Sequence, residues 1–170
     1  MSLLFDFTVD KEKKAIHITR EFAADRDIVW DAFTKAEILV QWVAPQPFKA
    51  YIKEMDFREG GRSLTAMLPP ETTLEQVTRW SLQEFTRIDP KDSFTSRNSF
   101  VDENFNPLGN GSSMTTNYFE AGTDMTTVRI EKIFDSLATV EWMATNGFKE
   151  GMALAMDKLD EYLRSVAVAK

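Results

Sequence analysis

The feature that most constrains the fold is one long apolar stripe at the end of the chain, preceded by a series of short alternating segments. From residue 148 onward, apolar residues recur at steps of three or four, which is the spacing of one helix face. Between residues 15 and 134, apolar and polar residues mostly alternate, as they do in half-buried strands. Because a sheet with one apolar face needs a cover, we expect the terminal helix to lie against the sheet. The stripe consists of Phe148, Met152, Met156, Leu159, Leu163 and Val166.

Turn signals divide the chain into short elements without a linker between them, so we expect one domain over residues 1–170. Ser136 is suited to cap the final helix, and Gly147 and Gly151 are expected to interrupt it. Short connections between consecutive strands indicate an antiparallel meander. The predicted strands are 15–22, 48–57, 62–68, 76–88, 93–101, 113–120 and 125–134, with short helices at 25–34 and 36–42.

The predicted fold class is therefore α+β. It is a curved antiparallel sheet of about six or seven strands, with two short helices after the first strand, gripping a long C-terminal helix. The composition supports a sizeable core, since 43% of the residues are hydrophobic and 13 are Phe.

The side chains that metal and nucleophile chemistry need are almost missing. The sequence has no cysteine and a single histidine, His17. This excludes disulfides, thiol nucleophiles and zinc sites that need several Cys or His ligands. His17 lies between Ile16 and Ile18 and should point away from their buried face. We therefore expect no catalytic residues, no metal and no cofactor.

The net charge of −7, from 20 basic and 27 acidic residues, argues against a nucleic-acid partner. No apolar run is long enough to span a membrane, so we expect no membrane span. The first residues lack a basic region followed by a long apolar core, and we therefore expect a cytoplasmic protein. The sequence leaves the oligomeric state open, a homodimer included.

Several motifs resemble a known family, and they occur in order over nearly the whole chain. They are Ile-Thr-Arg-Glu-Phe (18–22), Val-Trp-Asp-Ala-Phe-Thr (29–34), Glu-Ile-Leu-Val-Gln-Trp-Val-Ala-Pro (37–45), Glu-Met-Asp-Phe-Arg-Glu-Gly-Gly-Arg (54–62), Ile-Asp-Pro (88–90), Ser-Phe-Val-Asp-Glu (99–103), Gly-Phe-Lys-Glu-Gly-Met (147–152) and Leu-Asp-Glu-Tyr-Leu (159–163). Together they resemble the START-like helix-grip (SRPBCC) proteins, in the branch similar to the C-terminal domain of activators of heat-shock-protein ATPase homologues.

The resemblance implies the helix-grip fold but no shared catalytic set, because fold does not fix function. The sequence departs from the family pattern at three places. Val43 and Ala44 replace a usual Trp-Gly pair, and Met152 replaces a usual Trp. Ser96 and Asn98 stand in a strand where family members tend to carry large apolar residues.

A set of apolar, aromatic and polar residues from separate elements should converge between sheet and helix. Met suits an adaptable ligand-binding surface, and inward polar groups need a partner, which a ligand or water can supply. The same residues can also form an ordinary core, and the sequence leaves both readings open. The predicted ligand-binding residues are Trp42, Met55, Phe57, Thr65, Met67, Phe94, Ser96, Asn98, Phe100, Met152 and Met156.

Three functions follow as hypotheses. The leading one is a binding module that holds a hydrophobic small molecule or lipid in a cavity between the sheet and the C-terminal helix. The second is an enzyme of the cyclase or hydrolase-like helix-grip type, using polar residues in the cavity. The third is a co-chaperone-like domain that acts through its surface. We expect a binding protein rather than an enzyme.

Overall fold

The computed structural model describes residues 3–109 and 111–168, which form one open antiparallel sheet of eight strands and four α-helices. The strand order is β1-β2-β8-β7-β6-β5-β4-β3, so β3 to β8 make a meander and β2 pairs with β8. The strands are β1 (Phe5–Asp10), β2 (Ala15–Phe22), β3 (Lys49–Met55), β4 (Arg62–Leu68), β5 (Trp80–Asp89), β6 (Ser93–Val101), β7 (Ser113–Gly122) and β8 (Met125–Phe134). The helices are α1 (Arg26–Thr34), α2 (Ala36–Leu39), α3 (Leu137–Thr145) and α4 (Phe148–Val168), with a 3-10 turn at Leu74–Gln76.

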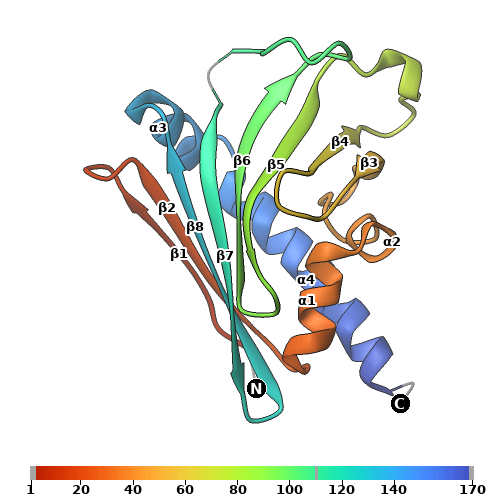
Figure 1. Cartoon of the computed structure of the whole chain (residues 1–170), viewed down its shortest axis with the longest axis vertical. Coiled ribbons are helices and arrows are strands. Elements are labelled where there is room, and N and C mark those ends of the chain that lie inside the picture. Colours follow the sequence, from red (N-terminus) through yellow and green to blue (C-terminus); the bar gives the residue numbers. More distant parts are fainter. Residues whose placement is uncertain (1–2, 110, 169–170) are drawn as a thin grey trace.

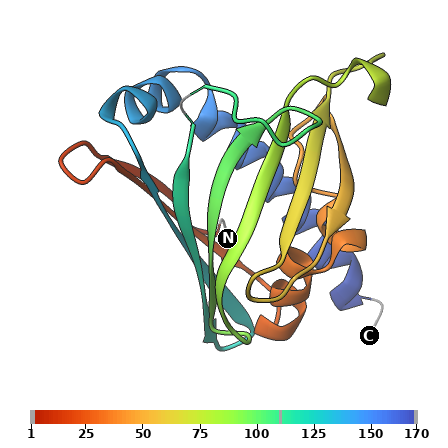
Figure 2. The same ribbon diagram turned by 45° about the horizontal axis from the view of Figure 1, so that its top comes forward.

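The sheet is strongly curved, and α4 crosses its concave side (Figure 1). Turning the molecule shows α4 running behind β7, β6 and β5, with α1 and α2 near its C-terminal end (Figure 2). The predicted α+β helix-grip architecture is thereby confirmed.

The sheet contains one strand more than the upper number expected from the sequence. Strand β1 precedes the first predicted strand and pairs with β2 from Phe5↔Arg20 to Asp10↔Ala15. Phe5, Phe7 and Val9 pack against the main core, while the residues between them are more polar. The two short helices consequently follow the second strand of the sheet rather than the first.

The final helical segment is divided into two helices at Gly147. Ser136 caps α3, since its hydroxyl accepts a hydrogen bond from the Thr139 amide at 3.2 Å. Gly147 has a φ of +84°, a left-handed conformation that ends a right-handed helix, and α4 begins one residue later. Gly151, by contrast, lies within α4.

Apolar side chains form two clusters, one on each face of the sheet. The main core fills the concave side between the sheet and the helices, and α4 contributes Ala155, Met156, Leu159 and Leu163 to it. The smaller cluster lies on the opposite face of the sheet. It is formed by the residues of β4, β5 and β6 that alternate with the inward ones, because adjacent strand residues point to opposite faces. Its buried members are Leu64, Ala66, Trp80, Leu82 and Val101. None of the described helices is long and apolar enough to cross a membrane.

Candidate functional site

A continuous line of hydrogen-bonded side chains crosses five neighbouring strands on the concave face of the sheet. We call it the concave polar chain; its members are Ser63 (β4), Gln83 (β5), Ser96 and Asn98 (β6), Thr115 (β7) and Lys132 (β8). Cross-strand register explains the arrangement, since Ser63 lies opposite Gln83 and Gln83 lies opposite Asn98. Thr115 in turn lies opposite Ser96 and Lys132.

All hydrogen bonds in the first part of this chain run in one direction. The Ser63 hydroxyl donates to Gln83 Oε1 at 3.2 Å, and Gln83 Nε2 donates to Ser96 Oγ at 3.0 Å. The Ser96 hydroxyl then donates to Asn98 Oδ1 at 2.8 Å. Asn98 Nδ2 donates to Thr115 Oγ1 at 2.9 Å. Each donor therefore serves the next member of a line that begins on β4 and reaches Thr115 on β7.

Lys132 meets this line from the other side. Its Nζ donates to the same Thr115 Oγ1 at 2.8 Å. Thr115 thus accepts two hydrogen bonds, and both lone pairs of its hydroxyl oxygen are used. None of the ion pairs among the described residues includes Lys132.

The neighbours of Lys132 on β8 and β2 are apolar, whereas on β7 it faces Thr115. Ile130 and Phe134 precede and follow it on the same face of β8, and Ile16 lies opposite it on β2. These three side chains are buried members of the main core. An ammonium group loses hydration among such neighbours, and burial accordingly lowers the pKa of Lys132 to about 8.

Some side chains of the concave polar chain are buried, and others are accessible from solvent. Ser96 and Thr115 are buried, whereas Gln83, Asn98 and Lys132 are half-buried. Direct neighbours across strands are close enough for side chains to interact, so the register holds all six groups together. The site can therefore offer several positioned hydrogen-bonding groups to a molecule on the concave face.

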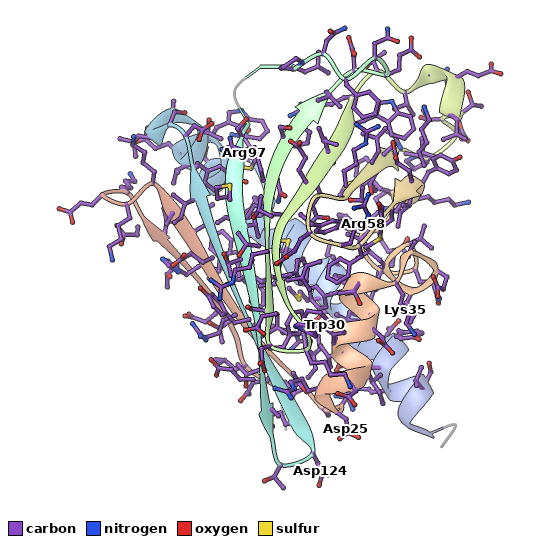
Figure 3. The ribbon with its side chains drawn as sticks, viewed as in Figure 1. Asp25, Trp30, Lys35, Arg58, Arg97 and Asp124 are labelled. Atoms are coloured by element: carbon purple, nitrogen blue, oxygen red, sulfur yellow. The ribbon has the colours of Figure 1, made fainter. Side chains whose placement is uncertain are left out.

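Four of the predicted ligand-binding residues lie in or against the closely packed aromatic end of the core. Phe94 is buried, and its ring lies 5.2 Å from that of Phe57 and 5.8 Å from that of Trp30. Trp42 is buried and donates from Nε1 to the Ala32 carbonyl at 3.0 Å. Met156 is 1% exposed. In Figure 3, Trp30 points from α1 into this region.

Four further predicted residues are half-buried. Met55 and Met152 pack against the main core, from β3 and from the first turns of α4. Thr65 follows Ser63 on the same face of β4 and lies opposite Ser81. Phe100 lies on the parity of Ser96, with the Arg79 guanidinium 3.9 Å above its ring.

Met67 is the predicted residue that the structure places differently. Its side chain is 51% exposed, so the expected position between sheet and helix is wrong. The pairing of β4 with β5 ends at Thr65, and beyond this point β4 pairs only with the edge strand β3. Met67 consequently lies at the open margin of the sheet.

Ser96 and Asn98 lie in the polar chain and have the inward parity expected from the sequence. Their polar groups have protein partners, since Asn98 accepts from Ser96 and donates to Thr115. Ser63, Gln83, Thr115 and Lys132 were not predicted. The alternation of β8 could have indicated Lys132, because it shares one face of the strand with the apolar residues Val128, Ile130 and Phe134.

Two surface hollows in the described part of the chain lie away from the polar chain. One, of about 220 Å³, is lined by His17, Thr19, Arg129 and neighbouring residues of β2, β7 and β8. The other, of about 320 Å³, lies between Val40, Phe48 and Lys158. The internal pocket expected from the sequence stays a prediction.

Metal binding finds no support among the described residues, where no three His, Asp or Glu side chains gather in a metal-binding group. His17 is half-buried, and its Nδ1 lies 3.9 Å from Glu131 Oε2. Both residues have the outward parity of their strands, so this pair lies on the face opposite the polar chain.

A curved antiparallel sheet that holds a C-terminal helix, with polar groups on the enclosed face, defines a helix-grip protein of the START-like (SRPBCC) class. The chain belongs to the family described as activator of Hsp90 ATPase homolog 1-like protein, whose model matches residues 23–164. No curated protein matches the sequence.

Solved structures share this fold over nearly the whole chain. Protein Ms6760 from Mycobacterium smegmatis has a TM-score of 0.84 and 24% identity, covering 97% of this chain and 99% of its own. A protein from Arthrobacter aurescens has a TM-score of 0.84 and 27% identity, covering 94% and 91%. CalU16 from Micromonospora echinospora has a TM-score of 0.59 and 20% identity, covering 96% and 74%.

Proposed function

We propose that this protein binds a small, mainly apolar molecule on the concave face of its sheet, beneath the N-terminal part of α4. The concave polar chain is the observation that carries the proposal. An apolar core gains nothing from six polar side chains in a row, because each must be desolvated on folding. Their retention is understandable if they orient a bound molecule.

The partial exposure of the concave polar chain supports the same function. Gln83, Asn98 and Lys132 are half-buried, so a ligand can reach part of each group without unfolding the sheet. Met152 of α4 and Phe100, which shares a face of β6 with Ser96, are also half-buried and provide apolar surface. Binding would remove this surface from water and add favourable free energy in proportion to its area.

Lys132 also favours a second candidate, an enzyme of the cyclase or hydrolase-like type. An amine with a pKa of about 8 exists partly as the free base near neutral pH. Such a group can transfer protons to and from a bound molecule. A catalytic role would convert the ligand, whereas a binding role would return it unchanged.

Native mass spectrometry of the purified protein tests the binding proposal. We expect a co-purified small molecule that dissociates under collisional activation and is absent from the Met152→Trp variant. Tryptophan at this half-buried position adds volume where the ligand is expected to lie. The matched control is Leu154→Trp, because Leu154 is 47% exposed on another face of α4.

The result has three informative forms. The additional mass of a bound molecule, present in the wild type and in Leu154→Trp but absent from Met152→Trp, would support binding at the concave site. Mass retained in all three proteins would place the ligand elsewhere. If no mass accompanies the wild type and none of a set of added amphipathic molecules raises its melting temperature, the binding proposal is wrong.

A further inference from the structure

The hydrogen-bonding balance at the β7–β8 end of the concave polar chain is uneven, because its last two members, Thr115 and Lys132, have donors to spare. Thr115 Oγ1 accepts from both Asn98 and Lys132, so its own hydroxyl hydrogen remains to be donated. In the described part of the chain, no acceptor for this hydrogen is found. A charged Lys132 has three N–H donors and uses one of them, on Thr115.

The charge at this end is also unbalanced. No described Asp or Glu forms an ion pair with Lys132, and its neighbours Ile16, Ile130 and Phe134 are buried apolar residues. A half-buried charge is less hydrated than an exposed one, so a partner of opposite charge would stabilise it. The donors of Ser63, Gln83, Ser96 and Asn98 follow one another along the line, and the last of them, the Asn98 amide, places the positive end of its dipole at Thr115.

We infer that the molecule bound on the concave face is an organic acid, whose carboxylate accepts hydrogen bonds from Lys132 Nζ and the Thr115 hydroxyl. This inference rests on the proposed binding function and specifies the chemical class of the ligand. A carboxylate accepts hydrogen bonds and donates none, so it matches a group of free donors. Its negative charge would form the ion pair with Lys132 that no described Asp or Glu forms. The apolar body of the acid would lie against the half-buried part of the core.

A pair of fluorescent probes tests the inference, because pyrenebutyrate and pyrenebutanol share one apolar body and differ in the acid group. We expect the wild type to bind pyrenebutyrate at least about tenfold more tightly than pyrenebutanol, as charge-assisted hydrogen bonds allow. Lys132→Met should bind both probes with similar affinity. Lys149→Met removes the same charge from an exposed position of α4 and should keep the wild-type preference.

The outcomes separate the two proposals. Equal affinities of the wild type for both probes would overturn the organic-acid inference and leave the binding function standing. An unchanged preference in Lys132→Met would overturn the role of Lys132 in the same way. Failure of the wild type to bind either probe would count against the binding function, and the inference would fall with it. The wild-type comparison decides the ligand class even if Lys132→Met fails to fold.

Discussion

At the scale of single residues, the polar chain illustrates how one side chain depends on its neighbours. Asn98 is inward as the alternation of β6 predicts, and two protein groups satisfy it. Its partners Ser96 and Thr115 are themselves buried. Removing Asn98 would therefore affect groups that water cannot easily reach.

Asn98→Leu is expected to lower the free energy of unfolding by about 1–3 kcal/mol, because the Ser96 hydroxyl loses its acceptor and Thr115 loses a donor. Urea denaturation followed by circular dichroism measures this change. The control is Asn104→Leu in the exposed loop after β6, which should change the value by less than about 0.5 kcal/mol. An equal or higher stability of Asn98→Leu would show that Asn98 is held for a ligand rather than for the fold.

Lys132 links stability to pH, and the sign follows from its lowered pKa. The pKa is about 8 in the folded protein against 10.5 for an ordinary lysine, so between these values the unfolded chain binds more protons. The free energy of unfolding therefore rises with pH across this window. Below it, the folded protein carries the cost of a partly desolvated charge that has no ion-pair partner among the described residues.

Lys132→Met is consequently expected to be more stable than the wild type at pH 7, with the difference shrinking by on the order of 2 kcal/mol towards pH 10. Thr115 keeps its hydrogen bond from Asn98, so the substitution leaves that oxygen partnered. Denaturation curves of both proteins over this pH range provide the measurement. Parallel pH profiles of the two proteins would contradict the shifted pKa.

At the scale of elements, the sequence predicted most of the sheet because turn residues and alternation agree there. The segments 62–68, 93–101 and 125–134 coincide with β4, β6 and β8. The segment 76–88 was placed too early, since Leu74–Gln76 forms a 3-10 turn and β5 begins only at Trp80. A capping box between Thr73 and Gln76 stabilises that turn, and alternation alone does not reveal it.

The final helix shows where local patterns stop being informative. Its apolar stripe was predicted correctly, but of the two glycines expected to interrupt the helix only Gly147 does so, and the expectation for Gly151 is wrong because it lies within α4. The sequence does not distinguish between them, although only Gly147 has a positive φ. Gly151 meets Pro45 at an ordinary contact distance, 3.8 Å from the position a Cβ would take.

These two glycines should respond to alanine with opposite signs. Gly147→Ala is expected to cost about 1–2 kcal/mol, because a side chain disfavours the left-handed conformation. Gly151→Ala is expected to gain about 0.5–1 kcal/mol, because alanine favours a helix interior and the new methyl group has room. Thermal unfolding of both variants measures the two shifts, and equal signs would contradict the break between α3 and α4.

At the scale of the whole molecule, the fold was predictable and the site was only partly so. The order of elements determines that a sheet must be covered by the terminal helix. It does not determine which strands lie side by side on the concave face. Ser63 and Lys132 belong to one hydrogen-bonded line although 69 positions separate them (132 − 63). Such a line emerges only when β4 to β8 are paired in register.

The whole molecule is also expected to be independent of metal ions, since the sequence has one His and no Cys. EDTA should leave the melting temperature unchanged, because chelators destabilise proteins whose fold requires a metal. Differential scanning calorimetry with and without the chelator makes this comparison. A reproducible decrease that added calcium or zinc reverses would reveal a metal site built from carboxylates.

The direction of the concave polar chain has a consequence for proton movement. A row of hydroxyl groups can pass a proton along by exchanging donor and acceptor roles, but the amides of Gln83 and Asn98 donate and accept through different atoms. Each amide would have to rotate before its hydrogen bonds could reverse. The line therefore insulates Lys132 instead of acting as a proton wire. A proton that Lys132 gains or loses must be exchanged with water at the rim or with any molecule that binds there, and the amine stays chemically isolated from the β4 margin of the sheet.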